Sequence, residues 1–340
     1  MVGRDRIRKL KKLAKKYENS ALAIFFGDPN LKYFLDRDIS TALLLAISDN
    51  VTLYLSEMDK YLAEDLQRNN GLEVKIYDRL GKIFEEAKGE GIKEIGLNYS
   101  RVAMDIGSKL SKKFKIFDIS KDLEEMRSIK DKEEIRRIKK ACRIANNIIE
   151  SLVIEDDEQS IAASLIYEAR LSGYKEAFDP IVASGANSAL PHAKPLNKKV
   201  ESPLIIDFGV IYENYCSDLT RTFILEERGE IVDAFNAVSE AKKEACKVIG
   251  DGVRVIEVDK AVRDVLREYG YEKFFLHSTG HGIGIEVHEA PHISRNSKEV
   301  LKNGNVFTIE PGIYITRKFG IRIEDVYLLE RNRVKILSRK

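Results

Sequence analysis

The sequence predicts an α+β protein of two domains, on three observations. Its 340 residues are about twice the length of a common domain. The first 120 or so residues alternate between short apolar runs and helix-like segments, a pattern typical of a small α/β domain with a covered sheet. Beyond them, long helical patterns alternate with strand-like runs that hold nearly all the unusual polar residues. We expect an N-terminal domain over residues 1–124 and a C-terminal domain over residues 125–340.

The N-terminal domain shows closely spaced strand and helix patterns after a charged, helix-like start. Expected strands cover residues 21–27, 42–47, 51–55, 73–77, 94–97 and 115–118, and expected helices cover residues 56–70, 79–88 and 101–112. Ser56 is the expected N-cap of the first of these helices. The domain contains no histidine and no glycine-rich phosphate loop, so we expect no chemistry in it.

A capping box marks the start of the C-terminal domain. Asp131 and Glu134 have the spacing of that motif, and apolar residues then recur at helical spacing as far as Leu152. Further long helices are expected over residues 158–171, 230–249 and 255–269.

Composition excludes several classes of protein. Lysine and arginine (57) nearly balance aspartate and glutamate (55), so the usual electrostatic argument for binding nucleic acid or an anionic membrane is missing. Three cysteines without a CxxC pair make a disulfide framework or a thiolate zinc site improbable. The longest apolar runs are far short of the roughly 20 residues that span a bilayer, and no signal peptide precedes them. We expect a cytoplasmic protein.

Carboxylates inside apolar strand-like runs are the strongest chemical signal. Asp207 and Asp218 flank a turn near Glu213. Whether the turn is centred on Tyr212-Glu213 or on Glu213-Asn214, the two aspartates lie on one face of a hairpin. Like charges so close need a neutralising partner. The plain alternative is a turn with two solvated aspartates.

A second pair of carboxylates favours a metal over that alternative. Glu310 and Glu324 each interrupt an apolar strand, and a buried carboxylate needs a partner, commonly a metal. Arg322 lies two residues from Glu324 on the same face, where it can hold a ligand carboxylate in place. A surface ion pair is its alternative interpretation.

His281 supplies the nitrogen of this predicted site. It stands four residues after His277, but three neighbouring glycines argue against a helical zinc motif and favour a flexible backbone that presents His281 inward. Four carboxylates and one imidazole carry a charge of −4, which two divalent ions neutralise. An oxygen-rich set with one nitrogen suits manganese, cobalt, iron or zinc.

At these residues the sequence resembles the pita-bread metallopeptidases, the family of methionine aminopeptidase and prolidase. The resemblance rests on the order and spacing of five residues: Asp207, Asp218, His281, Glu310 and Glu324. Residues 178–192 and 281–289 further resemble the proline-specific branch. The resemblance covers essentially the whole chain. It implies a pita-bread catalytic domain preceded by the smaller α/β N-terminal domain of the creatinase, prolidase and aminopeptidase P branch.

The resemblance also implies a role for each ligand. Asp207 would bind one metal, His281 and Glu310 the other, and Asp218 and Glu324 both. A hydroxide between two divalent ions, most readily manganese or cobalt, would attack the scissile carbonyl. Glu310 would also carry a proton toward the proline nitrogen.

Non-ligand residues complete the implied site. His192 and His288 would hold substrate and stabilise the tetrahedral intermediate. His292 stands where several dipeptidases have an arginine that grips the substrate carboxylate, and Arg322 is the other candidate for substrate binding. His277 and His292 are each more readily explained as structural histidines.

The implied activity is hydrolysis of Xaa-Pro dipeptides by a homodimer that binds small peptides and neither nucleic acid nor membrane. Three alternatives remain: an aminopeptidase P acting on longer peptides, a metal-free creatinase, and a non-catalytic binding module. The intact ligand set argues against the last two. A stretch over residues 28–38 replaces a common family loop that reaches the partner subunit's active site. Its Asp36, Arg37 and Asp38 are candidates for shaping specificity, although a solvated charge run is the simpler interpretation.

Overall fold

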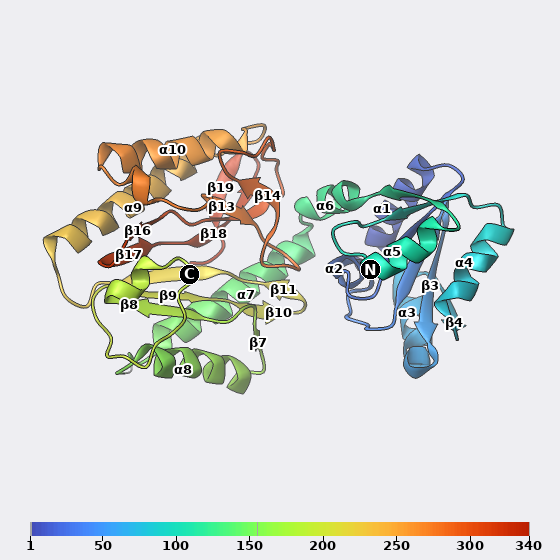
Figure 1. Cartoon of the computed structure of the whole chain (residues 1–340), viewed down its shortest axis with the longest axis horizontal. Coiled ribbons are helices and arrows are strands. Elements are labelled where there is room, and N and C mark those ends of the chain that lie inside the picture. The colour runs from blue at the N-terminus through green and yellow to red at the C-terminus, as the bar shows by residue number, and fades with distance from the viewer. Residues whose placement is uncertain (1, 155, 340) are drawn as a thin grey trace. The chain divides into compact units, whose positions relative to one another are not determined.

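Figure 1 shows the protein as a computed structural model that describes residues 2–154 and 156–339. The chain divides into two compact units, Met1–Arg127 and Ser128–Lys340. Both mix helices with sheets, so the predicted α+β class is confirmed. No helix among the described residues is long and apolar enough to cross a membrane.

One six-stranded sheet in the order β4-β3-β2-β1-β5-β6 forms the centre of the N-terminal unit. Its strands are β1 (Ser20–Phe25), β2 (Leu43–Ile47), β3 (Asn50–Ser56), β4 (Glu73–Tyr77), β5 (Glu94–Leu97) and β6 (Lys115–Asp118). β2 is antiparallel to both its neighbours, and the outer pairs are parallel. Every residue of β1 is buried, as in a sheet covered on both faces.

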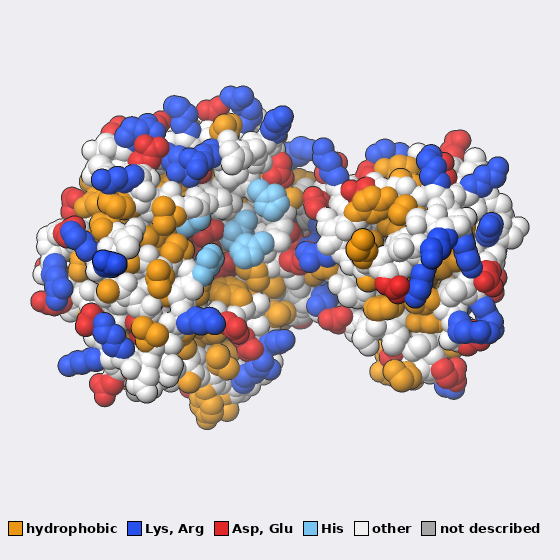
Figure 2. All heavy atoms as spheres, in the orientation of Figure 1, with side chains coloured by type: hydrophobic (Ala, Val, Ile, Leu, Met, Phe, Trp, Pro, Cys, Tyr) orange, Lys and Arg blue, Asp and Glu red, His pale blue; other side chains and the backbone are white. Residues whose placement is uncertain are grey.

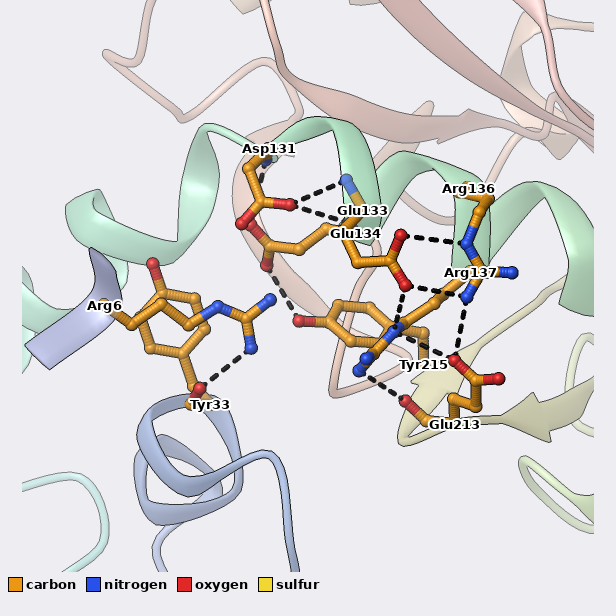
Figure 3. Close-up of polar contacts among 9 residues, drawn as sticks. All are labelled: Arg6, Tyr33, Asp131, Glu133, Glu134, Arg136, Arg137, Glu213 and Tyr215. Atoms are coloured by element: carbon orange, nitrogen blue, oxygen red, sulfur yellow. Dashed lines mark hydrogen bonds and ion pairs between the residues drawn. The ribbon is translucent and has the colours of Figure 1, made fainter. Parts of the chain in front are cut away.

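Six α-helices accompany this sheet among the described residues of the unit. They are α1 (Val2–Lys16), α2 (Pro29–Leu35), α3 (Ala63–Asn70), α4 (Leu80–Gly89), α5 (Met104–Ser111) and α6 (Ser120–Ser128). Arg6 links α1 to α2, because its buried guanidinium donates a hydrogen bond to the Tyr33 carbonyl at 2.9 Å and lies over the Tyr33 ring (Figure 3).

Two predictions in this unit were wrong in detail. Ser56 makes no side-chain capping bond, and the segment expected as one helix begins as a 3₁₀ turn over Glu57–Leu62 before α3. The stretch interpreted as a loop contains α2. Asp28 caps this helix by accepting from the Asn30 amide at 2.8 Å, and Pro29 occupies its first turn.

The C-terminal unit starts with the predicted capping box, which the structure confirms at α7 (Lys132–Ser151). The Asp131 carboxylate accepts from the Glu133 and Glu134 amides, and the Glu134 carboxylate accepts from the Asp131 amide (Figure 3). Glu134 also accepts from the Tyr215 hydroxyl at 2.9 Å, which attaches α7 to the hairpin that carries the predicted aspartates.

Four small sheets lie between two pairs of helices in this unit. In Figure 1, α7 and α8 (Glu158–Leu171) cover one side of the strands, and α9 (Gly229–Val248) and α10 (Val255–Glu268) cover the other. The sheets have the orders β12-β9-β8, β11-β10-β7, β14-β13-β15-β18-β19 and β16-β17. The strands are β7 (Lys175–Glu176), β8 (Ile181–Ser184), β9 (Leu204–Phe208), β10 (Val210–Tyr212), β11 (Tyr215–Cys216), β12 (Leu219–Phe223), β13 (Gly280–Gly282), β14 (Glu289–Ile293), β15 (Val306–Ile309), β16 (Gly312–Ile315), β17 (Phe319–Arg322), β18 (Asp325–Glu330) and β19 (Arg333–Ile336).

A core of small side chains on α9 fixes the strands behind the site. Ala234, Ala237 and Ala241 are fully buried and belong to one cluster with Val258 of α10 and Phe307 of β15. Small residues let the two helices pack closely against each other and against the sheet. The strands that carry the predicted ligands therefore have a rigid support.

Candidate metal centre

A cavity of about 640 Å³ in the C-terminal unit brings the predicted residues together. Figure 2 shows histidine side chains gathered around a hollow with acidic side chains between them. Its lining includes all nine residues predicted from the sequence: His192, Asp207, Asp218, His281, His288, His292, Glu310, Arg322 and Glu324.

The hairpin of β9 to β12 positions Asp207 and Asp218. The chain reverses at Glu213 and Asn214, both of which have positive φ, as a tight hairpin turn requires. β12 then pairs with β9 so that Thr220 lies opposite Asp207, and Asp218 directly precedes β12. Both carboxylates are buried.

Glu310 and Glu324 come from the ends of strands in two neighbouring sheets. Glu310 follows β15, and Glu324 lies between β17 and β18. The Thr220 hydroxyl donates to Glu324 Oε2 at 2.7 Å, which joins the glutamate to the aspartate hairpin. Glu324 is 1% exposed, and its second oxygen, Oε1, is buried.

His281 lies in β13, which confirms that the histidine is not on a helix. The prediction of a flexible backbone was wrong, because the glycines beside it serve close packing. A Cβ on Gly280 would lie 2.0 Å from the Thr308 carbonyl oxygen, and one on Gly282 would lie 2.1 Å from that of Ala290. Only glycine allows neighbouring strands to approach β13 so closely.

These side chains form overlapping groups of candidate ligands. One of them includes His288, because ligand atoms of Asp218, His281 and His288 lie within 4.8 Å of one another. The other two groups, the two ligand groups, consist of predicted metal ligands alone. Ligand atoms of Asp207, Asp218 and Glu324 lie within 4.8 Å of one another, as do those of His281, Glu310 and Glu324. His281 Nε2 is 3.2 Å from Glu310 Oε1 and 3.6 Å from Asp218 Oδ2. Asp207 Oδ1 and Glu324 Oε1 are buried without a hydrogen-bond partner among the described residues. Buried orphan carboxylate oxygens in an oxygen-rich set fit divalent cations.

Burial and mutual repulsion perturb the acidity of the cluster. Burial, together with the charges of Glu310 and Asp207, raises the pKa of Glu324 to about 8. Burial and the neighbouring carboxylates also raise the pKa of Asp218 well above its usual value. Burial opposes ionisation of both His281 and Glu310, but their mutual hydrogen bond and attraction outweigh it. They raise the pKa of His281 to about 9 and lower that of Glu310 to about 2. Such opposed shifts in one cavity are typical of functional sites.

Arg322 holds Asp207 from behind. Its guanidinium donates to Asp207 Oδ2 at 2.7 Å, to the Tyr314 hydroxyl at 2.7 Å and to Thr220 Oγ1 at 3.1 Å. The side chain is buried, so the ion pair lies away from solvent. Asp207 is thereby left with one free oxygen, Oδ1, for a further partner.

His277 and Tyr314 belong to the same network, although His277 is expected only as a structural histidine and Tyr314 is not among the predicted site residues. The Ser278 carbonyl can only accept, so His277 carries its proton on Nδ1, which donates to that carbonyl at 2.8 Å. In the neutral ring Nε2 is an acceptor, and the Tyr314 hydroxyl, which itself accepts from Arg322, donates to it at 2.9 Å. Burial lowers the pKa of His277, in keeping with a neutral ring. No short pattern in the sequence sets Tyr314 apart, because it lies within a strand whose residues are all buried.

His192, His288 and His292 are more exposed and line the same cavity. The His288 ring packs edge-on against that of His281, with centroids 4.2 Å apart. His292 lies opposite His281 in the β13–β14 pair. Three imidazoles thus surround the carboxylate cluster where a substrate could contact them.

Comparison with known proteins agrees with this geometry. Residues 136–331 match the model of metallopeptidase family M24, and residues 6–129 match the creatinase/prolidase N-terminal domain. The chain belongs to metallopeptidase family M24. Its fold is therefore the pita-bread domain of that family after a creatinase-type N-terminal domain, as the sequence predicts.

Similar proteins span the full length of this M24 chain. An Xaa-Pro dipeptidase of Pyrococcus furiosus is 37% identical, over 99% of this chain and 98% of that protein. A prolidase structure from Pyrococcus horikoshii superposes with a TM-score of 0.89 at 33% identity, covering 99% of this chain and 98% of the other. An X-Pro aminopeptidase structure from Thermotoga maritima has a TM-score of 0.86, also at 33% identity, covering 96% and 98%.

Proposed function

We propose that this M24 protein is a metal-dependent Xaa-Pro dipeptidase. The observation that carries the proposal is the cluster of four carboxylates and one imidazole, two of whose buried oxygens lack a partner among the described residues. Full-length similarity to an Xaa-Pro dipeptidase and a prolidase supports the substrate class. We assign the chemistry to residues 125–340, because all nine predicted site residues lie there.

The proposed centre holds two divalent cations, manganese or cobalt before iron or zinc. Asp207 would bind one cation, while His281 and Glu310 would bind the other. Glu324 belongs to both ligand groups, and Asp218 lies near His281 as well as Asp207, which supports bridging roles for these two. When bound, the cations would supply an activated water and polarise the peptide carbonyl.

The protein's own groups would handle the substrate and the proton. Glu310 is an ionised carboxylate at neutral pH, so it can accept a proton and return it to the departing proline nitrogen. His192 and His288 line the cavity beside the cluster, where their imidazoles can hold the substrate and donate to a developing oxyanion. Arg322 is already engaged with Asp207 and Tyr314, so its proposed part in substrate binding is to fix the cavity wall.

Aminopeptidase P activity is the second candidate, supported by the similarity to the Thermotoga maritima X-Pro aminopeptidase. The two activities differ in whether the cavity ends just beyond proline. His292 lies in the lining where it could meet a free carboxylate, and a neutral imidazole would hold one less firmly than an arginine. We therefore propose a preference for dipeptides with incomplete discrimination against tripeptides.

One assay distinguishes these candidates. Purified protein loaded with manganese or cobalt is given Xaa-Pro dipeptides and an Xaa-Pro-Xaa tripeptide, beside the Glu310→Gln variant as the inactive control. Faster dipeptide hydrolysis supports the proposal, and faster tripeptide hydrolysis supports aminopeptidase P. A protein without bound or activating metal would favour a non-catalytic or metal-free role.

Substrate histidines need a separate test. His192→Ala and His288→Ala should each lower turnover by about 10²–10³-fold, as loss of an oxyanion donor does elsewhere, while metal content stays at the wild-type value. Loss of bound metal in either variant would place that histidine among the ligands instead.

We also propose a cytoplasmic homodimer in which Asp36, Arg37 and Asp38 shape specificity. In the N-terminal unit Arg37 pairs with Asp65 at 3.2 Å and Asp38 with Lys32 at 3.0 Å, both in partly exposed positions. Light scattering checks the dimer, and charge-neutral variants at positions 37 and 38 check the effect on KM.

A further inference from the structure

A second cavity of the C-terminal unit, lined by other residues than the metal centre, is rich in basic side chains. It has a volume of about 640 Å³ and lies between α7 and the segment that follows β19. Nine described residues line it, and none of these nine is a carboxylate: Lys139, Lys140, Arg143, Ile144, Asn146, Asn147, Leu337, Ser338 and Arg339. It shares no lining residue with the candidate metal centre.

Three of its four cations have no partner in the part of the chain that the structure describes. Lys139, Lys140 and Arg143 follow one another along α7, and none forms an ion pair or side-chain hydrogen bond within residues 2–154 and 156–339. The chain pairs many of its other exposed cations, for example Arg136 on the same helix with Glu133 and Glu213. A concave surface lined by charge of one sign attracts counter-ions strongly.

The fourth cation, Arg339, belongs to a segment that hydrogen bonds hold against β18. The Leu337 amide donates to the Val326 carbonyl at 2.8 Å, and the Ser338 hydroxyl donates to Asp325 Oδ1 at 2.8 Å. Arg339 pairs with Asp325 Oδ2 at 3.0 Å. The cavity therefore has a fixed shape on this side.

The Arg339 side chain can turn toward a ligand, and the Asp325 carboxylate with which it pairs would still be neutralised by other cations. Asp325 is fully buried, and it also pairs with Lys242 at 2.6 Å and with Arg221 at 3.2 Å. Two cations would remain on this carboxylate after Arg339 moved. The cavity can thus offer four positive charges to one ligand.

We propose that this cavity is a binding site for an organic diphosphate, such as a nucleoside diphosphate. Several ammonium and guanidinium donors around one space suit a group with many anionic oxygens, and arginine binds phosphate in a bidentate manner. The buried apolar side chains of Ile144 and Leu337 line the same cavity and provide a surface for the organic part.

The local charge pattern favours a small ligand over a nucleic acid. A nucleic acid needs a basic surface that extends along its backbone. On α7 the basic run ends about two turns away in both directions, at Glu133 and at Glu150. The carboxylates at these positions interrupt the row of basic side chains along the helix, so the unpaired positive charge is confined to the cavity.

Calorimetric titration with pyrophosphate and with ADP tests the proposal. The full-length chain is first freed of metal with a chelator, so that phosphate cannot bind through metal ions, and ionic strength is kept constant. The test variant is Lys139→Gln/Lys140→Gln/Arg143→Gln. The control is Lys12→Gln/Lys88→Gln/Lys112→Gln, which removes the same charge from exposed positions in the N-terminal unit.

Both ligands should bind the wild-type chain, and the test variant should bind them at least a hundredfold more weakly, since each lost charge-assisted contact contributes about tenfold. The control should stay within twofold of wild type, and circular dichroism of all three proteins verifies folding. Arg143→Lys keeps the charge but should still weaken binding several-fold. Absence of binding at 1 mM, equal binding by the test variant, or tighter binding of a single-stranded oligonucleotide than of ADP would overturn the proposal.

Discussion

Lys130 and Glu289 form a buried ion pair whose removal should destabilise the C-terminal unit. Lys130 Nζ lies 2.6 Å from Glu289 Oε1, and the two side chains are 1% and 7% exposed. At an effective dielectric constant of about 20, unit charges at this distance attract by roughly 6 kcal/mol, part of which desolvation offsets. Lys130→Met removes the Lys130 cation from beside the buried Glu289 carboxylate, and breaking such a pair costs about 3–5 kcal/mol.

Thermal unfolding of the metal-loaded protein measures this loss. For a unit of this size the melting temperature should fall by roughly 6–20 °C. Lys132→Met, an exposed lysine nearby, should change it by less than about 2 °C. Lys130→Met/Glu289→Gln should recover much of the loss, because no full charge then remains buried. Turnover should fall as well in Lys130→Met, since Glu289 directly follows His288. A single variant as stable as the Lys132 control, or a double variant no better than the single one, would refute the reasoning.

Three further predictions concern the site. Asp218→Asn should lower the bound metal more than Asp207→Asn, because Asp218, unlike Asp207, lies near ligand atoms of both ligand groups; metal analysis that shows equal losses would argue against bridging. Manganese affinity of the metal-free chain should rise with pH through about 8, because the Glu324 carboxyl must lose its proton to bind a cation; equal affinities at pH 6.5 and 8.5 would contradict this. His292→Arg should lower KM for Xaa-Pro dipeptides and leave that for tripeptides nearly unchanged, and a parallel change in both would remove His292 from carboxylate binding.

Local patterns in the sequence were sufficient for most elements and for the fold class. Apolar runs, helical spacing and the Asp131 capping box each depend on residues a few positions apart, and the structure has elements at these places. The helix α2, which was not predicted, also has a local signal in the sequence. Asp28 followed by Pro29 is a strong helix start, whereas the family resemblance implies a loop over this stretch.

Contacts between distant strands could not be predicted in the same way. Arg322 was expected to hold a carboxylate. That its partner is Asp207, 115 residues away, depends on how β17 packs against β9. The link from His277 to Tyr314 likewise joins two segments that no short pattern relates. Chemical type is thus readable from the sequence, whereas the partner of each side chain is set by tertiary packing.

Thr220 shows why the candidate centre depends on the packing of two sheets. Its hydroxyl donates to Glu324 Oε2 and accepts from Arg322 Nε, and its carbonyl accepts from the Glu324 amide at 3.2 Å. Thr220 also pairs with Asp207 across β12 and β9. Thr220 therefore contacts both Asp207 and Glu324 of the first ligand group. Because Glu324 also belongs to the group of His281 and Glu310, the two groups are connected through it. Because the ligands come from separate sheets, folding has to bring four like charges together, and cation binding would then return part of that free energy to the folded state.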